Sequence, residues 1–273
     1  MKTYVITGAT SGIGYELVKY FAKDNIVFAG YRNSEKIEEL KRISSNIIPF
    51  YVDYNKPETI EKATDFIKSK TNKIDTLFNV AGCVVAGALE CIPVDELRRQ
   101  FDVNVFGHVG FSQNLLSLLD DGKIINISSM ASFGIFPFIS PYCASKRSLD
   151  ILFNALLLET KKNIKVISIK PGVVATPLWS KSIKENETII NACKDYSSET
   201  NYLKTNALKN EKQGYNVQKF VEKIVRIEKL KNPKPSYCIG MDSVIASIFS
   251  KLPQTILNKI IKLKNSNFQI WLS

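Results

Sequence analysis

A glycine-rich turn between a short apolar strand and a helix constrains the fold of this chain more than any other segment. Residues 2–7 have the composition of a buried parallel strand, and Gly8-Ala9-Thr10-Ser11-Gly12-Ile13-Gly14 follows at once. The next apolar residues recur at helical spacing. Glycines allow a tight turn and close approach to a pyrophosphate, and a helix N-terminus offers free N–H groups. We therefore predict a dinucleotide site at residues 8–14.

Strands and helices are predicted to alternate along the rest of the chain. The predicted strands are residues 2–7, 26–31, 46–52, 74–79, 123–127, 164–169 and 234–240, and helices are expected at 34–44, 57–70, 93–119, 142–158 and 216–228. This order favours an α/β fold with one doubly wound sheet. With 273 residues, no repeat and no linker, we expect a single domain over residues 1–273.

The second chemical signal is Tyr142 followed four residues later by Lys146. On a helix these side chains lie on one face, one turn apart. A nearby ammonium is expected to lower the pKa of the phenol, which would make it a proton donor or acceptor for a carbonyl/alcohol pair. The preceding strand delivers Ser128 and Ser129 to its carboxyl end, where sites in parallel sheets gather.

The end of the second strand indicates which dinucleotide is bound. Tyr31 and Arg32 stand where an acidic residue would accept the ribose hydroxyls of NAD, and a guanidinium pairs well with a phosphate. We therefore expect NADP(H) rather than NAD(H), although Arg32 is also suited to a plain surface role. Asp53, at the end of the third strand, is suited both to capping a turn and to contacting the adenine.

Histidine and cysteine usage excludes several kinds of site. With His108 as the one histidine, no multi-histidine metal site can form, and its position inside a helix favours a structural role. The five cysteines are scattered without a CxxC pair, so we expect reduced thiols, no metal site and a cytoplasmic protein. No leader pattern or apolar run long enough to span a membrane is evident.

Positive charge is concentrated in the last third of the chain. Of the formal net charge of +11, residues 177–273 contribute +8. The excess consists mostly of dispersed lysines, so we expect a solvated surface and no nucleic-acid binding. Residues 242–264 form a predicted amphipathic helical region interrupted at Pro253. Its lysines suit a solvated face or peripheral membrane contact, and packing on the protein's own core or on a partner subunit is the favoured alternative.

Two further segments are assigned from their patterns. Residues 177–215 are polar and irregular with short helical pieces, and we expect a substrate lid. Its apolar members are Leu178, Trp179, Ile183, Ile189 and Ile190. The helix at 147–158 is apolar on more than one face. We therefore expect a homodimer or homotetramer that uses it.

Seven motifs occur in the order found in the classical short-chain dehydrogenase/reductase family, which the chain resembles over about two thirds of its length. They are TGxxxGIG at Thr7–Gly14, Asp53, NxAG at Asn79–Gly82, Asn104, Ser129, YxxxK at Tyr142–Lys146 and PGxxxT at Pro171–Thr176. The YCASK and PGVVATP segments are similar to those of steroid- and retinoid-type members. The family usually has NNAG where this chain has Asn79-Val80-Ala81-Gly82.

The resemblance implies a Rossmann-type fold with seven parallel strands and a catalytic tetrad of Asn104, Ser129, Tyr142 and Lys146. Expected cofactor contacts, from the residues and the resemblance together, are Gly8, Thr10, Ser11, Gly12, Ile13, Gly14, Arg32, Asp53, Asn79, Ala81, Gly82, Tyr142, Lys146, Pro171, Gly172, Val174 and Thr176.

We therefore expect an NADP-dependent oxidoreductase that interconverts a carbonyl and a secondary alcohol, with an apolar small molecule as substrate. Tyr142 would be the general acid or base, and Ser129 would hydrogen-bond the reacting oxygen. Two alternatives stay open. One is a catalytically silent NADPH-binding sensor, against which an intact tetrad argues, and the other is a basic scaffold for membrane or nucleic acid.

Overall fold

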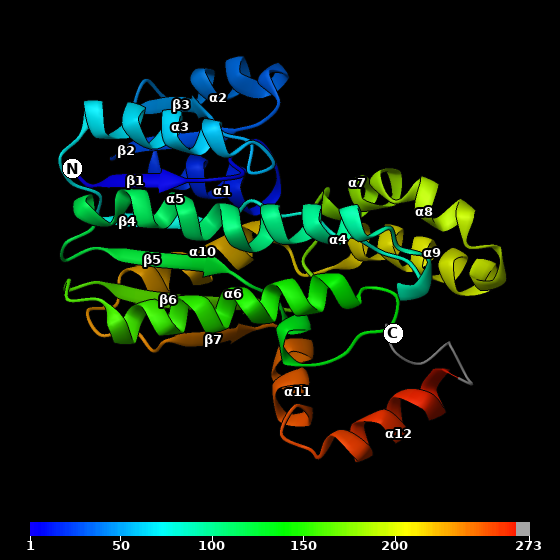
Figure 1. Ribbon diagram of the computed structural model, residues 1–273. Coiled ribbons are helices and arrows are strands. Elements are labelled where there is room, and N and C mark those ends of the chain that lie inside the picture. Colours follow the sequence, from blue (N-terminus) through cyan, green and yellow to red (C-terminus); the bar gives the residue numbers. More distant parts are fainter. Residues whose placement is uncertain (266–273) are drawn as a thin grey trace.

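Seven parallel strands form one sheet at the centre of the molecule (Figure 1). The computed structural model describes residues 1–265. The strands are β1 Thr3–Ile6, β2 Ile26–Tyr31, β3 Ile47–Tyr51, β4 Thr76–Asn79, β5 Lys123–Ile127, β6 Lys165–Pro171 and β7 Ser236–Ile239. Their order across the sheet is β3-β2-β1-β4-β5-β6-β7. The predicted α/β fold with seven parallel strands is confirmed.

Helices cover both faces of the sheet. They are α1 Gly12–Phe21, α2 Ile37–Ile43, α3 Pro57–Lys70, α4 Val94–Phe101, α5 Gly107–Leu115, α6 Ser140–Glu159, α7 Leu178–Glu185, α8 Glu187–Ala192, α9 Ser197–Gln213, α10 Val217–Glu228, α11 Met241–Phe249 and α12 Gln254–Asn265. In Figure 1, α3, α5 and α6 lie in front of the sheet, with α1 and α10 behind it.

Each face of the sheet has its own apolar core because successive strand residues point to opposite sides. Ile6 of β1 packs with Leu17 of α1 and Phe220 of α10. Val5, its neighbour in the strand, packs with Phe111 of α5 on the other face. All five of these side chains are 0% exposed. The sheet is therefore buried on both faces, as parallel sheets require.

The strand order reverses between β1 and β4, which lie side by side although two strands separate them in sequence. Strands on the two sides of such a switch point send their connections to opposite faces, which leaves a crevice at their carboxyl ends. The Gly-rich turn after β1 and the segment after β4 both open into this crevice. The fold therefore positions a site before any side chain is considered.

The predicted helix at 93–119 is continuous but not regular. Between α4 and α5 the chain makes a π-helical turn at Asp102–Phe106, and a 3₁₀ turn at Leu116–Leu118 follows α5. A π-turn inserts one extra residue and re-aims the side chains within it, and such turns recur at functional sites. Asn104 lies in this turn.

The segment 177–215, expected to be irregular with short helical pieces, holds the short helices α7 and α8, but α9 is longer than expected. Its composition explains the discrepancy. Residues 197–213 hold few apolar residues and therefore show no amphipathic period, although their glutamates, lysines and leucines favour helix. The packing of α7 against α9 supplies the order that the pattern does not reveal.

The C-terminal helical region divides as predicted, into α11 and α12 on either side of Pro253. The side chains of Leu263 and Lys264 lie outside the described part of the chain. The division of residues 1–273 into one domain with a lid at 177–215 stays a prediction. Within residues 1–265, the structure has no helix both long and apolar enough to cross a membrane.

Candidate active site

A cleft of about 330 Å³ lies at the carboxyl ends of β1, β4, β5 and β6, and residues of α7, α8 and α9 also line it. Ser129 and fifteen of the expected cofactor contacts line it: Gly8, Thr10, Ser11, Gly12, Ile13, Arg32, Asp53, Ala81, Gly82, Tyr142, Lys146, Pro171, Gly172, Val174 and Thr176. Gly14, Asn79 and Asn104 do not line it. The structure thus brings the sequence-predicted residues together from seven separate segments.

The Gly-rich turn has the backbone that a dinucleotide site requires. Gly8 and Gly12 have φ values of +63° and +53°, which residues with a side chain rarely adopt. A methyl group on Gly8 would lie 2.9 Å from Cα of Ala81, so the two segments approach as closely as backbones can. Gly14 does not face the cleft, because a methyl group there would overlap the carbonyl oxygen of Gly8.

These features fit a dinucleotide cofactor. The first turn of α1 opens toward the cleft, so its free N–H groups and positive dipole end are available to a pyrophosphate. Gly82 and Gly172 both line the cleft. When bound, NADPH or NADP⁺ would supply or accept the hydride, and residues 8–13 would hold its phosphates.

Tyr142 stands at the start of α6 with Ser129 on one side and Lys146 on the other. Ser129 is the second residue after β5. Its Oγ accepts a hydrogen bond from the backbone N–H of Ala131 at 3.0 Å. Lys146 Nζ lies 5.8 Å from the centre of the Tyr142 ring and donates to the carbonyl oxygen of Ile127 at 2.8 Å. The three side chains line the same wall of the cleft.

The electrostatics of Tyr142 differ from the sequence-based expectation. Burial raises the pKa of its phenol to about 12, and hydrogen bonding with Ser129 only partly opposes this. Burial also lowers the pKa of Lys146 to about 8. The expected lowering of the pKa of Tyr142 is therefore wrong for this structure, because the loss of hydration on burial has the largest effect on the phenol.

Asn104 connects α6 to the segment after β4 and does not face the cleft. Its amide oxygen accepts from the N–H of Cys83 at 2.9 Å, and its amide nitrogen donates to the carbonyl oxygen of Cys83 and to Ser145 Oγ. A methyl group on Gly82 would lie 3.4 Å from Asn104 Oδ1 and 3.7 Å from Lys146 Nζ. Asn104 and Lys146 are thus close neighbours with a glycine between them.

Two other predicted cofactor residues have structural partners. Asn79 is 0% exposed, and its amide nitrogen donates to Asn126 Oδ1 at 2.8 Å and to Ser112 Oγ at 3.1 Å, which joins β4 to β5. Asp53 lines the cleft and also accepts from the N–H of Asn55 at 3.1 Å. The turn-capping interpretation of Asp53 is confirmed, and it leaves the contact with adenine possible.

Arg32 lies at the rim of the cleft at the end of β2, where Nη2 is 3.7 Å from Oε1 of Glu185 on the lid. Lys181 is 3.9 Å from the same oxygen. An ion pair this exposed contributes little to stability, so the guanidinium stays available to a stronger anion.

His108 has the structural role expected of it. It is 0% exposed inside α5, and Nε2 lies 2.8 Å from the carbonyl oxygen of Ala81. Burial lowers the pKa of His108 to about 3, so the ring is neutral and donates its Nε2 proton to that carbonyl. Among residues 1–265, no three His, Cys, Asp or Glu side chains gather as a metal site would require.

The lid contributes residues that the sequence did not single out. Leu203, Lys204 and Ala207 of α9 line the cleft opposite Tyr142, together with Phe136 and Ile139 from the segment before α6. The four-residue spacing of Leu203 and Ala207 on α9 is the sequence pattern that could have revealed this lining. Ile189, by contrast, is buried with Val85 and Ile92 against the body and does not reach the cleft.

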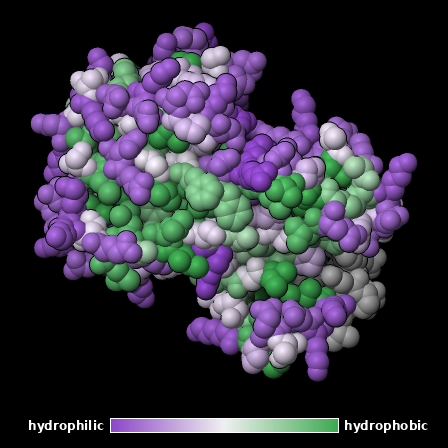
Figure 2. Space-filling model, viewed as in Figure 1, coloured by the Kyte–Doolittle hydropathy of each residue, from purple (hydrophilic) through white to green (hydrophobic). Residues whose placement is uncertain are grey.

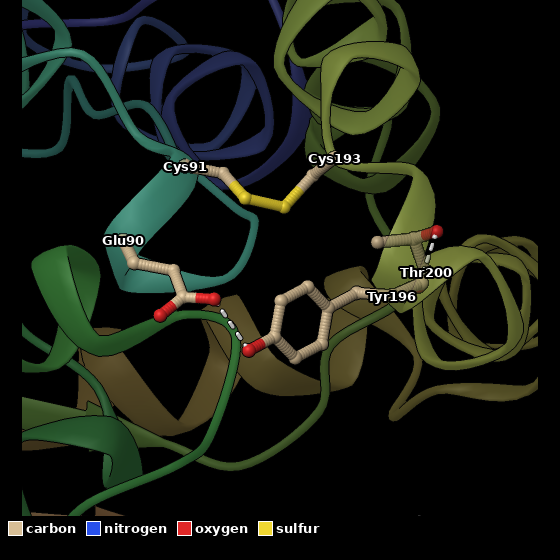
Figure 3. The surroundings of a disulfide bond; sticks show 5 residues. All are labelled: Glu90, Cys91, Cys193, Tyr196 and Thr200. Atoms are coloured by element: carbon tan, nitrogen blue, oxygen red, sulfur yellow. Dashed lines mark hydrogen bonds between the residues drawn. A yellow bond between two sulfur atoms is a disulfide. The ribbon is translucent and has the colours of Figure 1, made fainter.

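A buried asparagine and a disulfide fix the lid to the body. Asn186 donates to the carbonyl oxygen of Val84 at 2.7 Å and accepts from the N–H of Ala86 at 2.9 Å. Cys91 and Cys193 form a disulfide, beside which Tyr196 donates to a carboxylate oxygen of Glu90 at 2.6 Å (Figure 3).

The disulfide corrects the expectation of reduced thiols for Cys91 and Cys193, while Cys83, Cys143 and Cys238 are free. The pair is separated by 102 residues and has no spacing signal, because only the folding of the lid brings the two together. The cytoplasmic location inferred partly from the cysteines stays a prediction.

Comparison with known proteins identifies the family. The family model described as short chain dehydrogenase matches residues 2–187. This chain is a member of the short-chain dehydrogenase family. The match includes the Gly-rich turn, the tetrad and the start of the lid.

Short-chain dehydrogenases of different kinds are similar to this chain. It is 33% identical over 194 residues to the NADPH-dependent 3-dehydrocapnine reductase of Ornithobacterium rhinotracheale, covering 67% of this chain and 69% of that one. It is 35% identical over 200 residues to the NADPH-dependent 1-acyldihydroxyacetone phosphate reductase of Saccharomyces cerevisiae, covering 70% and 67%.

The fold matches as well. A short-chain dehydrogenase from Streptomyces avermitilis superposes with a TM-score of 0.76 at 20% identity, over 99% of this chain and 98% of that one. As a member of this family, the protein is an NAD(P)-dependent oxidoreductase acting on carbonyl and alcohol groups.

Proposed function

We propose that this short-chain dehydrogenase uses NADPH to reduce an apolar ketone to a secondary alcohol, with Tyr142 as the proton donor. The observation that supports the proposal is the position of Tyr142 on the wall of the cleft, with the ammonium of Lys146 5.8 Å from the centre of its ring and Ser129 on the same wall. In the reductive direction a proton must be given to the carbonyl oxygen, and a phenol placed in the cleft can donate it.

Each side chain has a distinct task. NADPH, when bound along residues 8–13, would supply the hydride for the carbonyl carbon. The phenol of Tyr142 gives its proton to the oxygen as charge develops there, and the Ser129 hydroxyl stabilises that charge with a hydrogen bond. Lys146, fixed on the carbonyl oxygen of Ile127, favours the phenolate that remains and so assists the transfer. By resemblance, its ammonium also holds the ribose hydroxyls.

Three observations support NADP(H) over NAD(H). Arg32 lies at the rim of the cleft, and the residue beside it at the end of β2 is Tyr31 in place of a carboxylate. Its partner Glu185 is a weak competitor at 3.7 Å. Both relatives compared above are named as NADPH-dependent. A 2′-phosphate would form charge-assisted hydrogen bonds with the guanidinium.

The lining of the cleft indicates the substrate class. Phe136, Ile139, Leu178, Ile183 and Leu203 present apolar surface around Tyr142. Lys204 and Lys181 place cations at the lid side of the same cleft. The cleft is therefore suited to a ketone with an apolar chain and an anionic end, and one relative is named for a substrate that carries both an acyl group and a phosphate.

The proposal extends to self-association through the helix at 147–158. Ile151, Leu152 and Leu158 on this helix are 56%, 42% and 85% exposed, and Phe106 beside α5 is 59% exposed. Hydrophobic residues cover this face in Figure 2. A second copy packed here would bury them, and multi-angle light scattering of the purified chain tests this, since a monomer at micromolar concentration would exclude it.

The experiment that tests the function is reduction of methyl ketones of increasing chain length, followed by loss of NADPH absorbance. We expect turnover to rise with chain length. Tyr142→Phe should lower turnover by at least ~10²-fold while leaving NADPH binding in calorimetry unchanged. Tyr20→Phe, which changes a 37% exposed tyrosine near the end of α1, is the matched control and should retain wild-type turnover. Equal turnover in the Tyr142→Phe variant would disprove the assigned proton donor.

A further inference from the structure

Helix α11 has the reverse of the side-chain distribution expected of a surface helix. Its small polar residues face the protein, as Ser243 is 0% exposed and its hydroxyl donates to the carbonyl oxygen of Lys170 at 2.7 Å. Its large apolar residues face outward, at the spacing of one helical stripe: Met241, Val244, Ile245, Ile248 and Leu252 are 73%, 40%, 47%, 61% and 37% exposed.

Helix α12 extends the same apolar surface. Ile256 is 45% exposed, and Leu257, Ile260 and Ile261 are half-buried at helical spacing. None of the residues from Gln254 to Lys262 is buried. In Figure 1, α11 and α12 extend away from the sheet, and Figure 2 shows hydrophobic residues at the surface in that region. Exposed apolar patches of this extent mark interaction sites.

Charge identifies the partner. Residues 241–265 contain four lysines, of which Lys251, Lys259 and Lys262 are exposed, and one acidic residue, Asp242. The carboxylate of Asp242 is directed inward and accepts from the N–H of Val173 at 2.6 Å. Within residues 241–262, the exposed charged side chains beside this apolar surface are all lysines. A second copy would bring the same cations and a further +11 of net charge against it.

Helix α11 is linked to the cleft through one turn. It packs against the turn Met130–Phe133, and Met130 and Ala131 of that turn line the cleft.

We propose that the outward face of α11 and α12 docks the protein on an anionic lipid surface. Apolar residues enter the boundary between headgroups and acyl chains, and Lys251, Lys259 and Lys262 contact anionic headgroups. This inference does not depend on the proposed reaction, because its readout is binding to lipid and not turnover.

The test is co-sedimentation of the purified full chain with vesicles of phosphatidylcholine containing phosphatidylserine, and with vesicles of phosphatidylcholine alone. We expect binding to the anionic vesicles, weakened by added salt, and much weaker binding to the neutral ones. Ile248→Asp should reduce the partition coefficient about tenfold or more, as should the triple change of Lys251, Lys259 and Lys262 to glutamate.

Matched controls test whether vesicle binding depends on this surface or on positive charge and exposed apolar residues in general. Leu230→Asp changes a 43% exposed apolar residue next to α10, and glutamate at Lys23, Lys56 and Lys62 removes the same charge elsewhere. Both controls should bind vesicles like the wild type. NADPH binding in calorimetry shows whether each variant is folded. If Ile248→Asp does not fold, the triple lysine variant still tests the proposal.

Three outcomes would overturn the proposal. The first is an absence of wild-type binding to anionic vesicles, and the second is equal loss in the control variants. The third is a dimer in light scattering that Ile248→Asp converts to a monomer without any change in vesicle binding, which would show that a second copy covers this face.

Discussion

The ammonium nitrogen of Lys170 lies 2.8 Å from a carboxylate oxygen of Asp150, directly behind the active site. Both side chains are almost fully buried, and the ammonium also lies 4.3 Å from the centre of the Phe133 ring. Asp150 follows Lys146 by one turn of α6, and its charge raises the pKa of Lys146 against the effect of burial. The carboxylate of Asp150 therefore favours the protonated form of Lys146.

We predict that Asp150→Asn moves the alkaline limb of the pH–rate profile to lower pH. Without the carboxylate, the pKa of Lys146 falls further below its present value of about 8, so the ammonium is lost earlier as pH rises. The same change leaves Lys170 buried without its partner and should destabilise the fold by about 3–5 kcal/mol. The measurements are turnover across pH and urea unfolding.

The double variant Asp150→Asn/Lys170→Met separates the two effects. Removing both charges should restore much of the stability, since a buried pair often contributes little net. The shift in the pH profile should stay. A double variant with the wild-type profile would show that Asp150 acts on structure alone.

His108 predicts how stability depends on pH. Its folded pKa is about 3, below the unfolded value near 6.5, so between these values the unfolded chain binds a proton that the folded chain refuses. Stability from this residue is thus fully present above about pH 6.5 and falls as pH drops toward 3. At about pH 5 the loss should be about 2 kcal/mol.

The chain has one histidine, so the assignment is direct. His108→Gln keeps a donor for the carbonyl oxygen of Ala81 but does not titrate in this range. Urea unfolding of both proteins at neutral and mildly acidic pH should show a smaller pH dependence in the variant. An equal change in the free energy of unfolding with pH in the two proteins would contradict a buried, neutral His108 ring.

Arg32→Ala should weaken NADPH binding about tenfold to hundredfold, because a hydrogen bond to a charged group contributes ~1.5–3 kcal/mol. NADH lacks the 2′-phosphate and should bind the variant and the wild type alike. Calorimetry at one salt concentration measures both. Arg98→Ala, on the exposed side of α4, is the control. A preference for NADH in the wild type would refute the assignment of Arg32.

The disulfide should restrain the lid. Cys193→Ser removes a link that closes a loop of 102 residues, and removing such a link costs about 2–4 kcal/mol. We expect faster proteolysis within residues 177–213 in this variant, and in the wild type after treatment with dithiothreitol. Cys238→Ser, which changes a free thiol, is the control. Equal cleavage of the oxidised wild type and Cys193→Ser would show that the link does not hold the lid.

The parts of the molecule that follow local rules were predictable from sequence. Strand composition, the Gly8–Gly14 turn and the apolar period of α10 each reflect interactions within a few residues. The inward position of Asn79, the pKa of Tyr142 and the Cys91–Cys193 pair depend on distant segments. The loss of hydration around Tyr142, for example, is caused by the lid and the segment before α6, which no local pattern reveals.

The contact between Asp242 and the loop after β6 makes the last helices part of the cofactor cleft. A methyl group on Gly172 would overlap the carboxylate of Asp242, which also accepts from the N–H of Val173. A chain shortened before Met241 would therefore lose a support of that loop together with the outer surface. Coupling between two sites is reciprocal in free energy. If the attachment of α11 changes the affinity for the cofactor by some factor, then bound cofactor changes the strength of that attachment by the same factor.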